Sequence, residues 1–445
     1  MAQYILENSR TDRKGWRMEK DINEIDEGIG YVGYQEAFDL ISANVKPVGT
    51  EEVTLSAGVG RIAAADMVAR LSYPSADVSL KDGFAVKSAD VAGASAGSPV
   101  LLRVIGAVFA GSGFKGEVKP GSAVKVFSGA PVPLGAEAVV SGEFCEEVPL
   151  GKVRIRADAG PGRNVLRAGG EVKAGATIVK KGSRLLPGYL GLAAAAGISR
   201  ATVYRRARVA ILGIGDEVVA PGEDLRPGQL YASNLVTMEA WLVSFGISCV
   251  TSVVRDSEVE ITRELQKCLP AVDVVLTSGG AWGSERDLVV GTLRGLGWRE
   301  VFNHVRMGPG KGIAFGVWHE KPVFCLPGGP ASNEMAFLQL ALPGVLRLGG
   351  DTRHPLPTVY ARLAEGLTSR HRAWTEFKDA TLRRDADGSY LAGLYRERSR
   401  LQAIAGANCL ICIPEGTESL RAGEIVPVQL QEMSPFFLRS SSEEM

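Results

Sequence analysis

Between residues 207 and 350, short apolar runs alternate with stretches in which apolar residues recur every three or four positions. The first pattern is typical of buried strands and the second of amphipathic helices. The predicted strands are Val209–Leu212, Cys249–Val254, Val272–Thr277 and Pro322–Leu326, and the predicted helices are Leu235–Phe245, Ser257–Leu269, Leu288–Leu296 and Ser332–Leu346. Repeated strand–helix units of this length predict a doubly wound α/β domain with a parallel sheet.

The pattern differs on both sides of this region. From residue 53 to 155, and again after residue 351, short β-type runs are separated by Gly and Pro. This spacing predicts a β-rich domain before the α/β domain and a small β domain after it. The expected strands are Val100–Ala110, Ser122–Phe127, Ala136–Val140, Thr358–Leu363, Ala373–Leu382, Leu410–Ile413 and Ile425–Leu430.

Two predicted helices border the β-rich region. Apolar residues at helical spacing predict one over Tyr34–Val45, and Pro187 opens an Ala-rich one that runs through Ala196. We expect these two parts of the chain to join in one segmented domain. The predicted division is a polar segment 1–28, a segmented domain of 29–52 and 156–206, a β-rich domain 53–155, an α/β domain 207–350, a β domain 351–432 and a polar tail 433–445.

Charge and composition limit the classes of partner. Lys plus Arg and Asp plus Glu number 50 each in the 445 residues, so no global field attracts nucleic acid or an anionic membrane. Any anion site must therefore be local. The first 28 residues are polar, and no run approaches the roughly 20 apolar residues of a membrane span. We expect a cytoplasmic protein with no membrane or nucleic-acid partner.

The cysteines and histidines do not indicate a metal centre. Cys409 and Cys412 form the only C-x-x-C pair, inside an apolar run and without a second pair. Buried strand residues are favoured there over zinc or redox ligands. The four histidines lack ligand spacing and are expected at the surface or in the core: His304, His319, His354 and His371.

Three glycine-rich loops follow predicted strands of the α/β domain: Gly213–Glu217, Thr277–Asp287 and Leu326–Ser332. The carboxyl ends of parallel strands meet at one edge of a sheet, where helix N-termini and loop amides bind ligands. Each loop alone is a weak signal, because such turns are more often plain connections. Ser332 also suits a helix cap, and the loop acids suit a solvated surface. Together the loops favour a site for an anion or a divalent cation.

Three further segments carry candidate chemistry. Lys311 lies in Met307–Gly312, where glycines leave little neighbouring bulk. A cation there suits an oxyanion, although an exposed glycine hairpin explains the segment equally well. In the β-rich region Asp82–Val86 and Ser128–Val140 stand out, the second stiffened by two prolines. Local sequence alone favours turns of a small β domain for both.

Taken together, these segments resemble the molybdopterin molybdenumtransferases, a family that includes the bacterial MoeA proteins and the E domain of gephyrin. The resemblance extends from about Tyr34 to Leu430 in the family's motif order. Several long motifs in fixed order are far more specific than any one of them. The matched segments are Asp82–Val86 (D-G-Y-A-V in the family), Ser128–Val140 (T-G-A-P-V-P), Asn164–Glu171 (N-hydrophobic-R…G-E-D), Gly213–Val218 (S-T-G-D-E-L), Ser278–Asp287 (S-G-G-V-S), Gly308–Gly312 (K-P-G-K-P) and Pro327–Ser332 (P-G-N-P-V-S).

The resemblance implies a multidomain fold in four parts. These are a segmented helical linker domain, a β-rich lid domain, a doubly wound α/β molybdopterin-binding domain and a C-terminal β-barrel. It also implies a homodimer in which the lid of one subunit, with Asp82 and Ser128, faces the α/β domain of the other. Other proteins of molybdenum cofactor biosynthesis are the further partners implied.

The chemistry implied is insertion of molybdate into adenylylated molybdopterin, with release of AMP and assistance from Mg²⁺. The implied catalytic residues are Asp82, Glu217 and Asp287, and the implied Mg²⁺ ligands are Asp216, Glu217, Asp256 and Asp287. The implied molybdate-binding residues are Lys311, Ser332, Arg372 and Ser399. The residues implied to contact molybdopterin or AMP are Ser128, Gly215, Asp216, Ser278, Gly279, Gly280, Pro327 and Gly328.

Several site positions depart from the family pattern: Gly170, Gly213, Trp282, Ser284, Gly308, Gly312 and Gly329. Trp282 replaces a small hydroxyl side chain with a large ring, which changes pocket volume and hydrogen bonding. The departures leave two alternatives: a paralogue that binds molybdopterin or the cofactor without insertion activity, or one that uses tungstate. The retained acids and Lys311 favour the enzyme.

Two more distant alternatives rank lower. A gephyrin-like scaffold would need a further domain or linker, and no segment is long enough for one. The adenylyltransferase that precedes this enzyme shares the α/β domain and the S-G-G loop, but it lacks the flanking β domains expected here.

Overall fold

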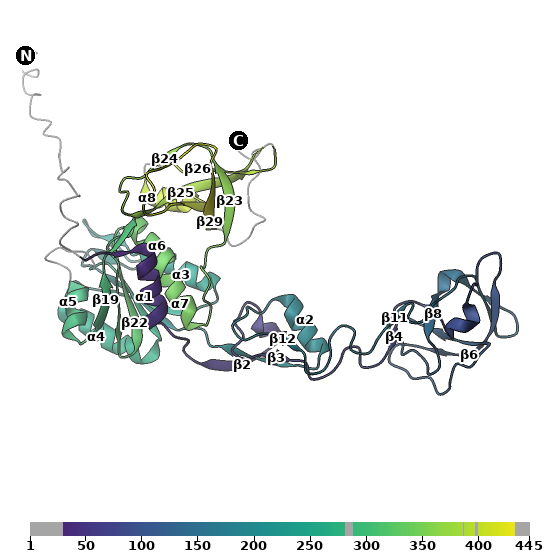
Figure 1. The fold of residues 1–445 in the computed structure, drawn as a ribbon. Helices are drawn as coiled ribbons and strands as arrows, with labels where there is room; N and C mark the ends of the chain where they lie inside the picture. Colours follow the sequence, from purple (N-terminus) through teal and green to yellow (C-terminus); the bar gives the residue numbers. More distant parts are fainter. Residues whose placement is uncertain (1–29, 281–287, 386, 397–398, 432–445) are drawn as a thin grey trace, which may run out of the picture. The chain divides into compact units, whose positions relative to one another are not determined.

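The computed structural model describes residues 30–280, 288–385, 387–396 and 399–431 (Figure 1). The chain forms two compact units. One comprises Gly49–Arg205, and the other combines the described residues up to Val48 with those from Arg206 onward. The two predicted polar tails lie outside the described residues, as do Asp287, Trp282 and Ser284. Within the described ranges, no helix has both the length and the apolar character needed to cross a membrane.

A six-stranded sheet forms the centre of the α/β part of the second compact unit, which is called the α/β unit below and does not include the C-terminal barrel. The strand order is β17–β14–β18–β22–β21–β19. Four strands are parallel, as predicted: β17 (Cys249–Val254), β14 (Val209–Ile214), β18 (Val274–Ser278) and β22 (Lys321–Leu326). Strands β21 (Ala314–Trp318) and β19 (Arg299–Asn303) add an antiparallel edge that the sequence did not predict.

The hairpin between β21 and β22 explains why this edge was missed. Its two turn residues, His319 and Glu320, have positive φ angles of 48° and 62°. Tight hairpins require this backbone conformation, and Asn or Gly normally supplies it. With His and Glu there instead, the sequence carries no ordinary hairpin signal.

The two faces of this sheet are covered by different helices (Figure 1). Along β14, Val209 and Ile211 point into one core, while Ala210 and Leu212 point into the other. This alternation follows from the two-residue period of a strand. The first core takes α1 (Tyr34–Asn44), α3 (Ser233–Ser244), α6 (Pro330–Ala336) and α7 (Leu342–Leu348), and the second takes α4 (Glu258–Cys268) and α5 (Leu288–Gly295).

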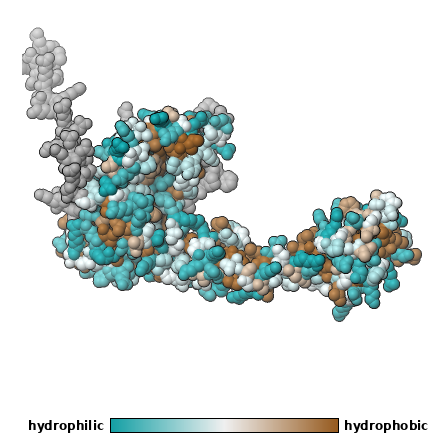
Figure 2. Space-filling model, viewed as in Figure 1, coloured by the Kyte–Doolittle hydropathy of each residue, from teal (hydrophilic) through white to brown (hydrophobic). Residues whose placement is uncertain are grey.

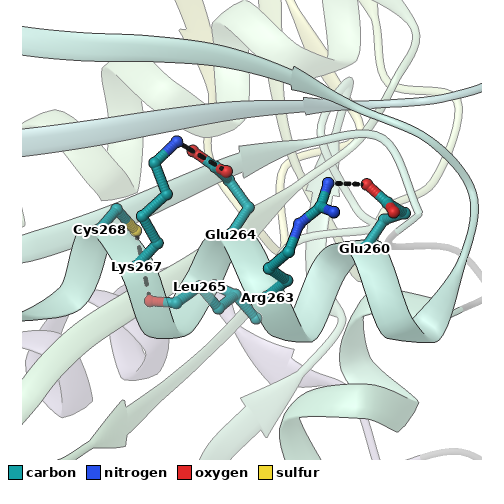
Figure 3. Close-up of polar contacts among 6 residues, drawn as sticks. All are labelled: Glu260, Arg263, Glu264, Leu265, Lys267 and Cys268. Atoms are coloured by element: carbon teal, nitrogen blue, oxygen red, sulfur yellow. Dashed lines mark hydrogen bonds and ion pairs between the residues drawn. The ribbon is translucent and has the colours of Figure 1, made fainter.

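Helix α4 shows how a polar face and an apolar face share one short helix (Figure 3). Ile261, Leu265 and Cys268 are buried against the sheet. On the other side, Lys267 Nζ lies 2.9 Å from a Glu264 carboxylate oxygen, and Arg263 pairs with Glu260. Exposed pairs of this kind contribute little, so burial of the apolar face holds the helix in place.

The predicted helix Ser332–Leu346 is interrupted by a π-helical turn. Helix α6 is followed by this turn at Phe337–Ala341 and then by α7. Pro343 has no N–H to donate to the carbonyl four residues earlier, which makes a regular α-helix costly at this point.

The interruption coincides with a buried polar contact. Gln339, which is fully buried in the π turn, accepts a hydrogen bond from Tyr34 Oη at 3.0 Å and donates to Gln429 Oε1 at 2.7 Å. His354 Nε2 lies 3.2 Å from the same Gln339 oxygen. One side chain therefore links α1, the π turn and the C-terminal part of the chain.

The expected C-terminal β-barrel is confirmed. Strand β25 pairs with both β26 and β27, and β23 pairs with both β26 and β29, while β27–β29 closes the ring. Cys409 lies buried in β27, as predicted for a strand residue. The strands are β23 (Thr358–Leu363), β25 (Thr375–Arg384), β26 (Tyr390–Leu394), β27 (Cys409–Ile413) and β29 (Ile425–Leu430).

The barrel continues into the α/β unit through two short strands. Strand β20 (Val305–Gly308) pairs in parallel with β25 on one side and with β1 (Val32–Gly33) on the other. Phe377 and Leu410 of the barrel belong to the same core as the α/β sheet. Helix α8 (Arg400–Gly406), which the sequence did not predict, packs between α6 and β25.

The unit Gly49–Arg205 is built on a second six-stranded sheet, in the order β8–β5–β7–β6–β10–β9. Three of these strands lie where strands were predicted: β6 (Val100–Val108), β7 (Ser122–Val126) and β8 (Ala138–Ser141). The others are β5 (Gly83–Val86), β9 (Cys145–Val148) and β10 (Lys152–Ile155).

Short two-stranded pairs extend this unit beyond the sheet. Strand β2 (Thr50–Thr54), from the first segment of the predicted linker domain, pairs with β13 (Arg200–Tyr204) from the second. The Ala-rich helix is α2 (Pro187–Ala195). Helix α1 also comes from the first segment, yet its Ala37 and Ile41 pack in the core of the α/β unit. The boundaries of the four domains stay a prediction.

Glu334 is a buried acid in α6, with 6% of its surface exposed. Burial raises its pKa to about 7, which outweighs a hydrogen bond from the Trp241 side chain on α3, and Asp379 of the barrel adds to the rise. Because the folded-state pKa lies above the ordinary 4.5, the folded protein keeps a proton that the unfolded chain has lost. Stability from this group is therefore present below about pH 4.5 and is lost as the pH rises through 7.

We predict that the substitution E334Q removes this pH dependence, because glutamine fills the site without titrating. The free energy of unfolding of E334Q should exceed that of the wild type by an amount that grows from pH 5 to pH 8, on the order of 2 kcal/mol at the upper end. Denaturant titrations at several pH values measure the difference. A constant difference across this range would contradict the prediction.

We also predict that L212A lowers the free energy of unfolding by about 2 to 5 kcal/mol, because it leaves a cavity beneath α4. Leu212 is 1% exposed and shares its core with Trp298 and Trp318, whose fluorescence reports unfolding. Val250 on the neighbouring strand is 58% exposed, so V250A serves as the control and should change stability by less than about 1 kcal/mol. Equal losses in the two variants would refute this account of the core.

Candidate functional site

The carboxyl ends of β14, β18 and β22 open into one cavity of about 840 Å³. The three predicted loops meet there, since parallel strands end at the same edge of the sheet. Six of the predicted site residues line the cavity: Glu217, Asp256, Ser278, Gly279, Gly280 and Gly328. The lining also includes Gly213, Ile214, Val218, Leu230, Tyr231, Ala232, Ser233, Asn234, Leu235, Pro330 and Leu401.

The Ser278 hydroxyl lies at the centre of the hydrogen bonds that hold these loops together. It accepts from Asn234 Nδ2 and from Asn333 Nδ2, each at 3.0 Å. Asn234 also donates to the Gly328 carbonyl at 2.8 Å, and Asn333 donates to the Pro327 carbonyl at 2.8 Å. Two asparagines thus tie the end of β18 to the loop after β22.

Neither asparagine was predicted from the sequence as a site residue. Asn234 is the second residue of α3, and Asn333 is the residue after the predicted Ser332. A polar residue in the first turn of a helix is usually solvated or caps the helix. Only Asn333 could have been found from the sequence, because it directly follows the matched motif Pro327–Ser332.

Backbone conformation explains why glycine is required at the two positions that follow β18. Gly279 and Gly280 have φ angles of 96° and 68°, which L side chains rarely adopt. A Cβ atom on Gly279 would lie 2.4 Å from the Ile214 carbonyl oxygen. The loops after β14 and β18 therefore approach as closely as they do only because Gly279 has no side chain.

Close neighbouring atoms explain two of the departures from the family pattern. A Cβ on Gly213 would lie 2.8 Å from Leu235 Cδ1, and one on Gly170 would lie 2.9 Å from both Leu166 Cδ1 and the Arg167 carbonyl oxygen. Larger residues at either position would need their neighbours to shift. Gly329, at the N-cap of α6, has open space around it, and nothing in the structure explains that departure.

Three of the acids proposed from the sequence, Asp216, Glu217 and Asp256, lie at this cavity or directly beside it. Glu217 and Asp256 line it, and Asp216 Oδ1 accepts a hydrogen bond from the Asp256 backbone N–H at 3.3 Å. Carboxylate oxygens are the ligands that Mg²⁺ prefers, so the donor set fits that ion. Among the described residues, no group of three or more His, Cys, Asp or Glu side chains is arranged to hold a metal. Asp287, the remaining predicted ligand, lies outside them.

Lys311 and Ser332 come from adjoining segments. Lys311 follows β20, and its Nζ lies 5.6 Å from the centre of the Trp374 ring. A Cβ placed on Gly310 would lie 3.4 Å from the Ser332 carbonyl oxygen, so the loop that carries Lys311 packs against α6 at Ser332. Two of the predicted oxyanion residues are thereby brought to one place in the fold.

Arg372 and Ser399 lie in the C-terminal part of the unit. Arg372 is exposed, and its Nε donates to the Gly416 carbonyl at 3.2 Å. Ser399 is the N-cap of α8, where its Oγ accepts from the Gln402 backbone N–H at 3.4 Å. Since α8 packs against α6 and its Leu401 lines the cavity, Ser399 begins a helix that borders the same site.

Asp82 and Ser128 lie together in the other unit, beside a cavity of about 400 Å³. Asp82 Oδ1 accepts from the Ser128 backbone N–H at 2.7 Å. The residue after Asp82 must be small, because a Cβ on Gly83 would lie 2.0 Å from the Val140 carbonyl oxygen. The two sequence motifs of the β-rich region thus form one local site rather than separate turns.

Family models match nearly the whole described chain. Residues 32–197 match the MoeA N-terminal region (domain I and II), residues 210–347 match a probable molybdopterin binding domain, and residues 360–431 match the MoeA C-terminal region (domain IV). The break between the first two matches contains the boundary between the two compact units at Arg205.

Two bacterial relatives and one archaeal structure are similar along most of their length. Molybdopterin molybdenumtransferase 2 of Mycobacterium tuberculosis is 32% identical over 83% of this chain and 92% of its own. The molybdopterin molybdenumtransferase of Haemophilus influenzae is 30% identical over 86% of this chain and 94% of its own.

The crystal structure of the molybdopterin biosynthesis MoeA protein from Pyrococcus horikoshii shares the fold, with a TM-score of 0.76 and 33% identity over 90% of this chain and 99% of that one. Similarity to this structure and to the family models includes the regions on both sides of the α/β domain. The chain therefore belongs to the molybdopterin molybdenumtransferase (MoeA) family.

Proposed function

We propose that the protein inserts molybdate into adenylylated molybdopterin and releases AMP, with Mg²⁺ as cofactor. The observation that carries the proposal is the cavity at the carboxyl ends of β14, β18 and β22, together with the cationic loop beside it. Relatives at about 30% identity across nearly their whole length carry the name of this activity.

The cavity suits the adenylylated pterin. Its volume of about 840 Å³ falls in the range of small-molecule sites, and loop glycines let backbone amides approach phosphate groups. We assign the substrate contacts to these loops, whose positions relative to one another are held by the hydrogen bonds to Ser278. The assigned residues are Gly215, Asp216, Ser278, Gly279, Gly280, Pro327 and Gly328.

Four acids proposed from the sequence are assigned to Mg²⁺, and two of them also to catalysis. Asp216, Glu217, Asp256 and Asp287 would hold the ion, which supplies charge stabilisation where the phosphate bond of the adenylate is cleaved. Asp216 is held by the Asp256 backbone, so these two loops are already in contact. Glu217 and Asp287 are also assigned catalytic roles.

The oxyanion is assigned to Lys311, Ser332, Arg372 and Ser399. Two cations and two hydroxyl groups match the charge and the hydrogen-bonding capacity of a tetrahedral dianion. Positioning such an oxyanion beside the dithiolene sulfurs is the main requirement of the reaction, since the sulfurs attack molybdate directly.

We further propose a homodimer in which Asp82 and Ser128 of one subunit serve the cavity of the other. Large apolar side chains are exposed on the unit Gly49–Arg205, and Figure 2 shows apolar patches on it in brown. These patches support the proposed contact surface. Leu71 is 60% exposed and Leu134 is 75% exposed. Isolated exposed residues are common, but patches of them mark association sites. We also propose that the protein acts in the cytoplasm and that other proteins of molybdenum cofactor biosynthesis are its partners.

The runner-up is a paralogue that binds the pterin without insertion activity or that uses tungstate. The departures at site positions motivate it, and Trp282 is the largest of these changes. The retained acids and the packing of the Lys311 loop against Ser332 favour the enzyme.

The direct test incubates the purified protein with molybdopterin adenylate, Mg²⁺ and molybdate. We expect release of AMP in step with formation of molybdenum cofactor, with a conventional homologue as the positive control. Tungstate in place of molybdate distinguishes the two oxyanions. Binding of the pterin without AMP release, while the homologue is active, would support the binding paralogue and overturn the proposal.

A second prediction concerns the loop glycine at the end of β18. G279A should weaken binding of molybdopterin adenylate by roughly tenfold or more, because its Cβ would force the loop away from Ile214. Gly297, with a φ of 83° and open space around it, supplies the control G297A, which carries a similar backbone strain far from the cavity lining. Calorimetric titration measures both affinities. Equal affinities in the two variants would show that this loop does not bind the pterin.

A further inference from the structure

One buried carboxylate, that of Glu376, lies between the two loops that carry the cations Lys311 and Arg372. Glu376 is the second residue of β25 and is 3% exposed. Its backbone pairs with Gly308, the last residue of β20. The loop to Lys311 leaves β20 at this point, so the position of Glu376 marks where that loop begins.

The side chain of Glu376 holds the other loop. Its Oε1 accepts hydrogen bonds from Ser369 Oγ at 2.9 Å, from the Arg370 backbone N–H at 2.5 Å and from the His371 backbone N–H at 2.9 Å. These three donors come from the turn that leads directly into Arg372. Its Oε2 pairs with Lys378 on the same strand.

The charge on Glu376 is stabilised despite its burial. Burial by itself raises the pKa of this carboxyl, but the hydrogen bonds from Lys378, the His371 N–H and Ser369 outweigh it and hold the pKa below the ordinary value. The group is therefore ionised at neutral pH, when its hydrogen bonds are charge-assisted and strongest.

Trp374 provides a second contact between the same two loops. Its ring lies beneath Lys311 Nζ, and its Cε3 lies 3.8 Å from where a Cβ on Gly308 would be. Its backbone N–H donates to the His371 carbonyl at 2.9 Å. Trp374 thus contacts both the Lys311 loop and the Arg372 turn, while the Glu376 carboxylate holds the turn.

We infer that Glu376 is a positioning residue for the tetrahedral oxyanion: its carboxylate fixes the turn that carries Arg372 relative to the loop that carries Lys311, without touching the oxyanion. This inference rests on the proposed function. A carboxylate is needed because four donors converge on it, three from the turn and one from Lys378. Those donors also shield a negative charge that would otherwise repel an anion.

The test is E376Q. Glutamine presents one acceptor oxygen and one NH₂ group, so either the turn or Lys378 meets a donor instead of an acceptor. We expect the KM for molybdate to rise roughly tenfold, the scale of one weakened charge-assisted hydrogen-bond set. The kcat at saturating molybdate and the KM for molybdopterin adenylate should stay within a factor of about 2. Hydrogen exchange at the Arg370 and His371 amides should accelerate.

Two further variants make the result decisive. E365Q changes another carboxylate of the barrel, which pairs with Arg396, and should leave the molybdate KM unchanged. S369A removes only one donor to Glu376, so it should fold and raise the molybdate KM by about 2- to 3-fold. If E376Q does not fold, S369A decides the question.

The outcomes separate the two claims. If the wild type is active and folded E376Q has an unchanged KM for molybdate, the inference alone is overturned. If E376Q fails to fold, an unchanged KM for molybdate in S369A has the same consequence. A rise in the molybdate KM in E365Q equal to that in E376Q would also overturn it. An inactive wild type would overturn the proposed function and this inference together.

Discussion

The arrangement of the cavity depends on the hydrogen bonds that converge on the hydroxyl group of Ser278. Asn234 and Asn333 donate to this oxygen from two different helices, and each also donates to a carbonyl of the loop after β22. Ser278 itself is 6% exposed, so loss of both donors would leave its hydroxyl oxygen without a partner and out of water. The neighbouring Gly279 and Gly280 adopt left-handed conformations, which glycine can do because it has no Cβ.

A second set of buried polar groups holds the barrel to the α/β unit. Gln339 contacts both Tyr34 and Gln429, while Glu334 contacts Trp241 and lies near Asp379. These groups add little net stability, and Glu334 reduces stability at neutral pH. Their geometry is directional, unlike that of the apolar contacts around them. They therefore specify how α6 sits between α3 and the barrel, and α6 carries Ser332.

Much of the fold could be predicted from the sequence, because strands and helices of the α/β domain differ clearly in hydrophobic period. The parallel strands β14, β17, β18 and β22 were predicted close to their observed bounds. The antiparallel edge was not, since its hairpin uses His319 and Glu320. For the site, the order of strands and loops sufficed to bring Gly279 and Gly328 to one cavity. Asn234 was missed because both of its hydrogen-bond partners are distant in sequence. Glu376 was missed because its carboxylate contacts are local, but the strand pairing that places it beside the Lys311 loop joins it to the distant Gly308.

The shared ladder from β1 through β20 to β25 has a consequence for how such proteins evolve. The barrel cannot be removed as a separate domain, because β20 would lose its pairing with β25. Its unpaired edge would then be exposed and prone to aggregation. Phe377 and Leu410 would also leave gaps in the α/β core. Recombination that exchanges C-terminal segments among relatives must therefore carry β20 along with the barrel or find an equivalent strand to replace it.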